Sequence, residues 1–210
     1  MVEIVPTITA ENAHVYREQM ERVEPYVQRI HIDLMDGIFT PNKSPQLESI
    51  WWPPQMRADI HLMYQNPNEH IDALVKLRPQ LVVVPAESEC DFAVLSKEFS
   101  GINTKLGVAL LPETSVEVIL PVLPYVQHVL IFSGNLGHQG GSRADLGLLT
   151  KVAEVKAANA LIEVGWDGGV NQDNVKQIAA AGVDVINVGG FVHTAPDPGL
   201  AIESLRTLLP

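Results

Sequence analysis

Three short apolar runs of this sequence carry histidine and aspartate residues that could bind a metal ion or move a proton. In the run RIHIDLMDG, His31 and Asp33 are two residues apart, and in ADIHLM the histidine is His61. Alternate side chains of a β-strand share one face, so His31 and Asp33 would point the same way. Asp167 ends a third run, EVGWDGG. Two imidazoles and two carboxylates that converge would suit one divalent metal ion, such as Zn²⁺, Fe²⁺, Mn²⁺ or Co²⁺.

The elements that would position these side chains recur along the whole chain. Short runs rich in Val, Ile and Leu alternate with stretches of helical character, and eight runs in 210 residues give about 26 residues per unit. Near-continuous apolar strands that alternate with helices indicate a parallel sheet covered by helices. The expected strands lie near residues 3–8, 29–34, 58–63, 81–85, 105–111, 128–133, 161–166 and 184–188.

Eight such units predict an α/β fold, a (β/α)8 TIM barrel in which residues 1–210 form a single domain. A doubly wound open sheet is the alternative, because the period alone does not exclude it. In a barrel, chemistry takes place at the C-terminal ends of the strands. The apolar neighbours of His31, Asp33 and His61 would face the helices, which directs these three side chains inward. Asp59, one layer lower, would either orient a ligand or pair with a neighbour.

Asparagine and glycine residues mark two of the expected helices. Asn68 stands at the start of a helical stretch in NPNEHIDALVKL, and Asn171 precedes QDNVKQIAAA. An asparagine in this place can cap the first turn, and a glycine after the last turn can end the helix. We therefore expect Asn68 and Asn171 as N-caps and Gly182 just beyond the second helix.

Glycines form a second candidate group, in loops that follow the last three expected strands. These loops read GNLGHQGGS, DGGVN and VGGFVH. In barrels, the loops after the seventh and eighth strands commonly bind phosphate through backbone N–H groups. Ordinary turns also require glycine, so one pair alone is a weak signal. The two pairs on adjacent strands are Gly168 with Gly169 and Gly189 with Gly190.

Composition argues against several classes of protein. The net charge is −11, so binding to nucleic acid or to an anionic membrane is not expected. A hydrophobic fraction of 46% excludes intrinsic disorder as the main state. The single cysteine, Cys90, cannot form an internal disulfide, and the opening MVEIVP lacks the features of a signal peptide. These observations predict a cytoplasmic protein.

The motifs around the candidate residues resemble those of the ribulose-phosphate 3-epimerase family. Residues 30–37, IHIDLMDG, resemble the signature that follows the family's second strand, and residues 59–63, DIHLM, resemble its third-strand signature. Residues 167–170, DGGV, resemble the seventh-strand signature, although DGG occurs in many phosphate-binding barrels. The order and spacing of the motifs match over nearly the whole chain.

The resemblance implies a TIM barrel that inverts C3 of a ketose phosphate, interconverting D-ribulose 5-phosphate and D-xylulose 5-phosphate. It implies one divalent metal ion held by His31, Asp33, His61 and Asp167, with the two aspartates as the acid/base pair acting through a metal-stabilised enediolate. This chemistry needs a proton carrier on each face of C3 and an electrophile for the enediolate oxygen. Which aspartate serves which face is left open. The residues implied to bind substrate are Thr7, Met35, Met63, Gly137, Gly140, Gly141, Gly168, Gly169, Gly189 and Gly190.

Several loops depart from the family's pattern. The usual Met-Ser-Val-Asn-Pro-Gly after the sixth strand is here FSGNLG at residues 132–137, and the usual Gly-Ser after the eighth is Gly189-Gly190. Leu111 stands where the family has an asparagine. His138, in the loop after the sixth strand, either approaches the ligand or is an ordinary loop residue. These changes leave the metal-binding side chains in place but alter loops that would contact substrate.

Three functions are therefore open. The leading one is a metal-dependent 3-epimerase of a pentulose 5-phosphate, and the second is a 3-epimerase of another ketose phosphate, such as a hexulose 6-phosphate. The third is a non-catalytic barrel that binds a sugar phosphate or a metal. Each implies a small-molecule ketose phosphate or ion as partner.

Residues 51–54, WWPP, would pack under the barrel rim or lie at an interface, so a homo-oligomer is also open.

Overall fold

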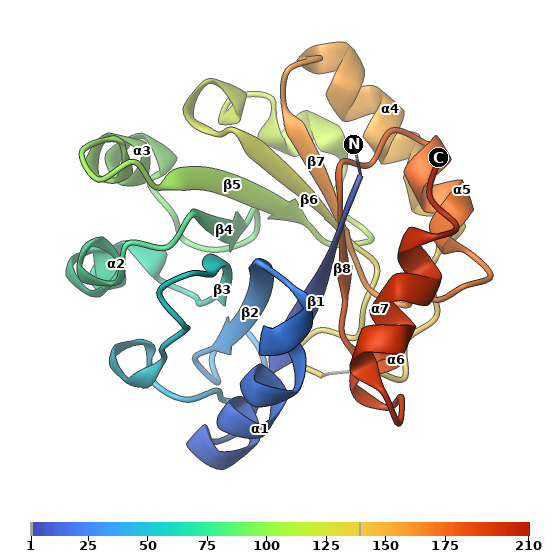
Figure 1. Ribbon diagram of the computed structural model, residues 1–210. Helices are drawn as coiled ribbons and strands as arrows, with labels where there is room; N and C mark the ends of the chain where they lie inside the picture. Colours follow the sequence, from blue (N-terminus) through green and yellow to red (C-terminus); the bar gives the residue numbers. More distant parts are fainter. Residues whose placement is uncertain (1, 139) are drawn as a thin grey trace.

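The computed structural model describes residues 2–138 and 140–210 and shows a closed barrel of eight parallel strands (Figure 1). Each strand pairs with the next along the chain, and the eighth pairs with the first. The TIM barrel is therefore confirmed, and the open sheet is excluded. The strands are β1 (Glu3–Thr9), β2 (Arg29–Met35), β3 (Arg57–Met63), β4 (Leu81–Pro85), β5 (Lys105–Leu110), β6 (His128–Phe132), β7 (Glu163–Asp167) and β8 (Val185–Val188).

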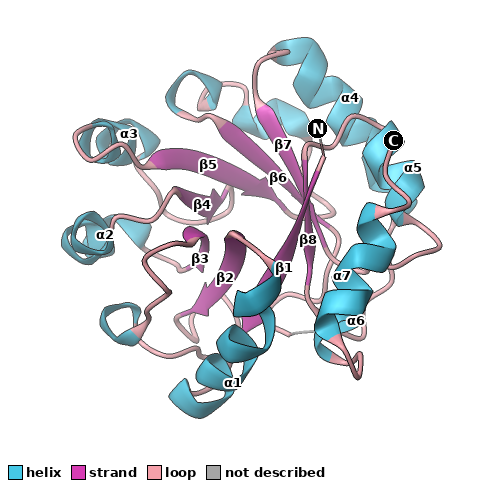
Figure 2. Cartoon of the chain, viewed as in Figure 1, coloured by secondary structure: helices cyan, strands magenta, loops and turns pink. Residues whose placement is uncertain are grey.

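Helices surround the barrel but do not follow every strand (Figure 2). Short 3-10 turns take the place of an α-helix after β2 (Leu47–Ser49) and after β5 (Val116–Ile119 and Leu123–Tyr125). Prolines break these connections, because proline cannot continue a helix interior. The α-helices are α1 (Ala13–Val23), α2 (Ile71–Leu77), α3 (Phe92–Ser100), α4 (Leu149–Ala158), α5 (Val175–Ala180), α6 (Gly190–His193) and α7 (Pro198–Arg206).

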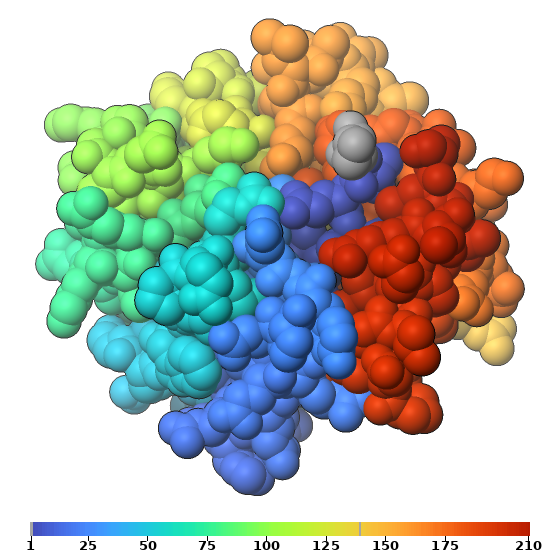
Figure 3. Space-filling view, in the orientation of Figure 1, coloured from blue at the N-terminus to red at the C-terminus, as the bar shows by residue number. Residues whose placement is uncertain are grey.

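The core has two parts because alternate residues of each strand face opposite ways. Outward side chains such as Ile30 and Ile32 are fully buried and belong to the large cluster between strands and helices. The smaller cluster consists of the inward residues Leu81, Val83, Ala109 and Leu130, on β4 to β6. Helix α7 packs against β1, and in the space-filling view the red C-terminal segment lies beside the dark blue N-terminal one (Figure 3).

The expected helix caps were only partly right. Asn68 lies inside a 3-10 turn (Pro67–His70), and its side chain instead pairs with the backbone of Asp91, accepting a hydrogen bond from the Asp91 N–H at 2.8 Å. Asn171 is not the N-cap of α5, because Asn174 occupies that position and the helix begins at Val175. Gly182 follows α5 with φ +98°, as expected for a residue that ends a helix. Within the described residues, no helix is long and apolar enough to span a membrane.

Candidate active site

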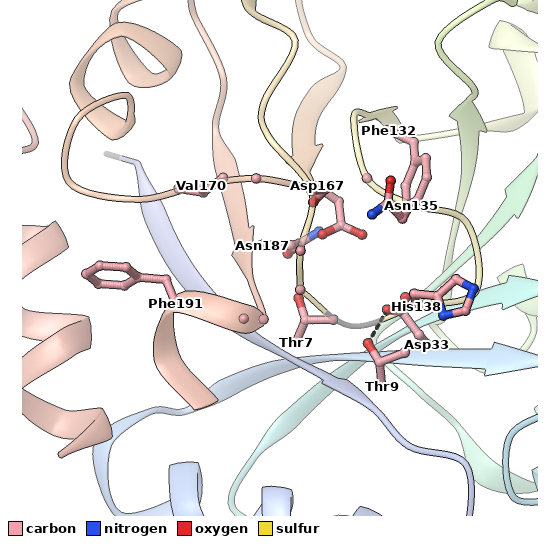
Figure 4. A pocket seen from close by; sticks show the side chains of 18 of the residues that line it. Thr7, Thr9, Asp33, Phe132, Asn135, His138, Asp167, Val170, Asn187 and Phe191 are labelled. Atoms are coloured by element: carbon pink, nitrogen blue, oxygen red, sulfur yellow. Dashed lines mark hydrogen bonds between the residues drawn. The ribbon is translucent and has the colours of Figure 1, made fainter. Parts of the chain in front are cut away.

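Strands β1 to β3 bring polar side chains together at the C-terminal end of the barrel. Thr9, Asp33 and His61 are neighbours across the three strands, since Thr9 pairs with Asp33 and Asp33 with His61. The Thr9 hydroxyl donates a hydrogen bond to Asp33 Oδ2 at 2.7 Å, drawn in Figure 4. Asp33 Oδ1 lies 3.2 Å from His61 Nδ1 and 3.3 Å from His31 Nε2. One carboxylate thus faces two imidazoles.

Asp167 joins this group from the tip of β7. One possible ligand atom from each of His31, Asp33, His61 and Asp167 lies within 4.8 Å of the others. All four side chains are buried, and the two imidazoles are only 1% exposed. The four residues singled out by strand parity therefore meet at one point of the barrel.

Burial and mutual charge shift the pKa values of these groups in different directions. Burial favours the neutral form of Asp33, but the neighbouring imidazoles outweigh burial and lower the pKa of this carboxyl. Burial, and then the negative charge of Asp33, raise the pKa of Asp167 to about 7. Burial lowers the pKa of His61, whereas Asp33 overcomes burial at His31 and raises its pKa. The two carboxyls therefore differ in how readily they ionise.

This donor set fits a divalent cation. Two carboxylates and two imidazoles are ligands that Zn²⁺, Fe²⁺, Mn²⁺ and Co²⁺ share. His61 Nε2 is buried and has no hydrogen-bond partner among the described residues. A buried polar atom without a partner is costly, and two buried carboxylates repel each other. A bound cation would relieve both costs.

A cavity of about 290 Å³ adjoins the cluster (Figure 4): Asp33 and Asp167 line it, whereas the buried His31 and His61 are not among its lining residues. None of its described lining residues is lysine or arginine. An anion bound here would therefore depend on backbone N–H groups and neutral side chains. The lining includes all seven glycines expected to bind substrate, which are Gly137, Gly140, Gly141, Gly168, Gly169, Gly189 and Gly190.

Close backbone packing explains why two of these positions are glycine. A Cβ atom at Gly190 would lie 2.8 Å from the Cα of Gly140, closer than side chains approach backbone. The serine that the family places here would therefore collide with the β6–α4 loop in this conformation. Gly168 has φ +113°, a conformation that favours glycine, and a Cβ there would strike the backbone of Gly134. The loops after β6, β7 and β8 thus converge on the cavity.

The remaining expected substrate residues are divided between two cavities. Thr7 and Met63 line the main cavity. Met35 is buried but lies instead on an adjoining cavity of about 220 Å³, which shares Thr9, Gly137 and His138 with the main one. Whether any of these residues binds substrate stays a prediction.

Several lining residues were not singled out from the sequence. Thr9 has the same strand parity as Thr7, so its inward orientation could have been expected, whereas its bond to Asp33 depends on the β1–β2 register. Phe132 stands over His61, with ring centroids 5.9 Å apart. Asn187 is a buried amide on β8, the neighbour of Asp167 in the β7–β8 pairing. His138, in contrast, was singled out with two roles left open; it lines the cavity and lies 3.2 Å from the Asn42 amide, which joins the β2 and β6 loops.

Asp59 belongs to a separate charged cluster at the N-terminal end of the barrel. Arg29 is only 4% exposed and donates hydrogen bonds to Asp59 at 2.7 Å, Glu3 at 2.9 Å and Glu163 at 3.1 Å. His128 adds a 2.8 Å contact to Glu163. Of the two roles open to Asp59, the structure shows the pairing one.

Comparison with known proteins agrees with the motifs. Residues 3–193 match the Ribulose-phosphate 3 epimerase family. The curated ribulose-phosphate 3-epimerase of Mycobacterium tuberculosis is 33% identical over 84% of this chain and 80% of its own length. That of Bacillus subtilis is 30% identical over 98% of this chain and 99% of its own length. The chain is thus a homologue of isomerases.

Solved structures support the fold alone. A 3-hexulose-6-phosphate synthase superposes with a TM-score of 0.73 and 21% identity over 100% of both chains. A 3-keto-L-gulonate-6-phosphate decarboxylase from Vibrio cholerae gives a TM-score of 0.74 at 10% identity, covering 99% of this chain and 96% of its own. At such identities the shared barrel is informative but the activities are not transferable. The family match over residues 3–193, in contrast, spans all three site motifs, and the chain belongs to the ribulose-phosphate 3-epimerase family.

Proposed function

We propose that this protein is a metal-dependent epimerase that inverts C3 of a ketose phosphate, interconverting D-ribulose 5-phosphate and D-xylulose 5-phosphate. The observation that carries the proposal is the buried group His31, Asp33, His61 and Asp167, of which Asp33 and Asp167 line a glycine-rich cavity. Family membership supports the sugar-phosphate substrate. A small soluble metabolite also fits a cavity of about 290 Å³.

The two aspartates would be the proton carriers. Inversion next to a carbonyl requires one group to remove the C3 proton and another to deliver a proton to the opposite face. An aspartate can bind a metal ion through one carboxylate oxygen and exchange a proton through the other, so each residue can serve both roles. Both reach the cavity, from β2 and β7.

The same four residues would hold the metal ion. A divalent ion bound there supplies a Lewis acid, which stabilises negative charge on the substrate oxygens. Thr9 fixes one oxygen of Asp33 by its 2.7 Å hydrogen bond and so orients the carboxylate. Met63 and Phe132 cover the centre with uncharged surface and would exclude water.

Glycine-rich loops would bind the phosphate. The cavity has no lysine or arginine among its described lining residues, so backbone N–H groups of the loops after β6, β7 and β8 are the available donors. Asn171 and Thr194 also line the cavity and could add neutral donors. This arrangement suits an anion in a protein whose net charge is −11.

Hydrogen exchange at C3 tests the proposal directly. Metal-loaded protein is incubated with D-ribulose 5-phosphate in D₂O, and the appearance of xylulose 5-phosphate and of deuterium at C3 is followed by NMR. We expect both, and we expect a chelator to stop them and added metal to restore them. Stoichiometric metal without exchange or epimerisation would favour the non-catalytic barrel and contradict the proposal.

A second candidate substrate is a hexulose 6-phosphate. The adjoining cavity of about 220 Å³ shares three residues with the main one and offers room for a longer sugar. The altered loop after β6 lines both cavities. Comparing kcat/KM for the pentulose and the hexulose phosphate distinguishes the two, and a higher value for the hexulose would replace the first substrate by the second.

A further inference from the structure

Asn187 is a buried amide that the proton-transfer chemistry does not use. It lies on β8 with its side chain on the inner face, is 2% exposed, and lines the main cavity. Its neighbour in the β7–β8 pairing is Asp167, and Figure 4 shows the two side chains close together. Two residues further along the chain, Gly189 begins the glycine pair on the same cavity. Asn187 therefore stands between a proton carrier and the candidate phosphate loops.

The amide of Asn187 is incompletely satisfied in the protein itself. Its Oδ1 atom is buried and has no hydrogen-bond partner among the described residues. Most buried polar atoms have such a partner, because leaving one without it is costly. The other inward positions of β8 are apolar or glycine, so an amide is not demanded by packing. A hydrogen-bond partner supplied by a bound ligand would explain why this position carries an amide.

We propose that Asn187 binds the substrate hydroxyl on C4, the carbon between the inverted C3 and the phosphate-bearing C5. This inference rests on the proposed function, which sets C3 at the two aspartates and the phosphate at the glycines. A carboxamide both donates and accepts hydrogen bonds, as a sugar hydroxyl does, so one residue can satisfy both capacities of the C4 hydroxyl. Asn187 and Gly189 are two residues apart, about 6.6 Å of strand, so the Asn187 side chain and the Gly189 loop can contact neighbouring groups of one substrate.

Asn187 would then act on specificity. A site built to bind a hydroxyl rejects an analogue that lacks it, because the buried amide is left without a partner. A variant with a side chain of the same size but without hydrogen-bonding groups would bind the substrate less tightly. It would also discriminate less between the substrate and an analogue that lacks the hydroxyl. The distinguishing quantity is therefore a ratio between two substrates, which does not depend on how much of a variant is folded.

The experiment compares wild-type protein and Asn187→Leu on D-ribulose 5-phosphate and on its 4-deoxy analogue. For wild type, we expect kcat/KM to be about 10- to 100-fold lower with the analogue. For Asn187→Leu, we expect that ratio to fall to about threefold or less. Val185→Ala is the matched control, since Val185 is a buried residue on the same strand face but outside the cavity lining, and it should keep the wild-type ratio.

Thermal unfolding separates this role from a structural one. A structural amide would make Asn187→Leu unfold at a lower temperature, whereas loss of an unsatisfied acceptor predicts an equal or higher temperature. A wild-type ratio that Asn187→Leu retains would overturn the inference while leaving the epimerase intact. A metal-loaded wild type that epimerises neither pentulose nor hexulose phosphate would overturn the proposed function, and this inference with it.

Discussion

The two ends of the barrel each bury a cluster of charged groups, but they balance the charge differently. At the N-terminal end, Arg29 lies among the carboxylates of Glu3, Asp59 and Glu163 and donates to all three. At the C-terminal end, Asp33 and Asp167 lie close together beside two imidazoles and neutral polar side chains, and no lysine or arginine lines the cavity among the described residues. Among the described residues, the protein thus supplies a permanent cation, the Arg29 guanidinium, at one end and only titratable imidazoles at the other.

The same chemical group responds in opposite ways to these two environments. At Glu163 burial favours the neutral form, but His128 and Arg29 outweigh it and lower the pKa of the carboxyl. At Asp167 burial and the charge of Asp33 act together and raise the pKa to about 7. A buried charge is tolerated when it is paired. The unbalanced end is therefore where an external cation would complete the site, and it is also the end with the cavity.

Removal of either proton carrier should have the largest effect. Asp33→Asn and Asp167→Asn keep the shape of the side chain but abolish proton transfer, so we expect kcat to fall by about 10³-fold or more in each. The measurement is steady-state epimerisation with the metal content of each variant determined in parallel. If either variant kept a tenth of the wild-type kcat with metal bound, the two-aspartate mechanism would be wrong.

Disrupting the other end should cost stability and leave the chemistry alone. Arg29→Met leaves three carboxylates without the cation that pairs with them. We expect it to lower the free energy of unfolding by about 3–5 kcal/mol, or the Tm by roughly 10 °C. Arg57→Met is the matched control, because Arg57 pairs with Glu3 at 2.9 Å but is 46% exposed, and its loss should cost at most about 1 kcal/mol. A large fall in kcat for folded Arg29→Met would show that the two ends are coupled.

Sequence reasoning found the C-terminal cluster because strand parity is local. His31 and Asp33 share a face once residues near 29–34 form a strand, and no knowledge of the neighbouring strands is needed. The positions of His61 and Asp167 follow by the same rule on β3 and β7. That all four approach within 4.8 Å then follows from closing the barrel.

The N-terminal cluster and Asn187 show what the sequence alone left out. The partners of Arg29 come from β1, β3 and β7, so the network depends on the register between strands, which local patterns do not specify. Asn187 was missed although it is the only amide in an otherwise apolar run with inward parity, a signal that was available. The loop after β6 has no periodicity from which its approach to the cavity could be predicted.

The pH dependence of metal-free protein should also distinguish the two ends. The folded protein holds the Asp167 proton up to about pH 7, whereas the unfolded chain releases it near pH 3.8. Between these values folding binds a proton, so rising pH weakens folding, by at most about 1.4 kcal/mol per pH unit. Asp167→Asn lacks this dependence. We therefore expect the Tm of Asp167→Asn, relative to that of wild type, to increase from pH 4.5 to pH 7.5.

The contrasting variant for this comparison is Glu163→Gln. Because the pKa of Glu163 is lowered, the stability it provides is fully present above its unfolded value of about 4.5 and is lost only at lower pH. Arg29 keeps its charge over this range, so the Tm of Glu163→Gln should stay below that of wild type from pH 5.5 to pH 7.5. Parallel Tm curves for wild type and Asp167→Asn over that range would contradict the unbalanced charge at the C-terminal end.

Metal addition should produce the smallest of these changes and should act at one end only. At a free metal concentration of 100 times its Kd, binding to the folded state adds about 2.7 kcal/mol to the free energy of unfolding. We expect Mn²⁺, Co²⁺ or Zn²⁺ to raise the Tm of metal-free wild type and of Arg29→Met by similar amounts, because the two clusters are separate. His61→Ala removes one donor of the C-terminal cluster and should lose most of the increase. An equal increase in His61→Ala would place the ion elsewhere, and a loss of the increase in Arg29→Met would show that the balanced end helps to hold the metal.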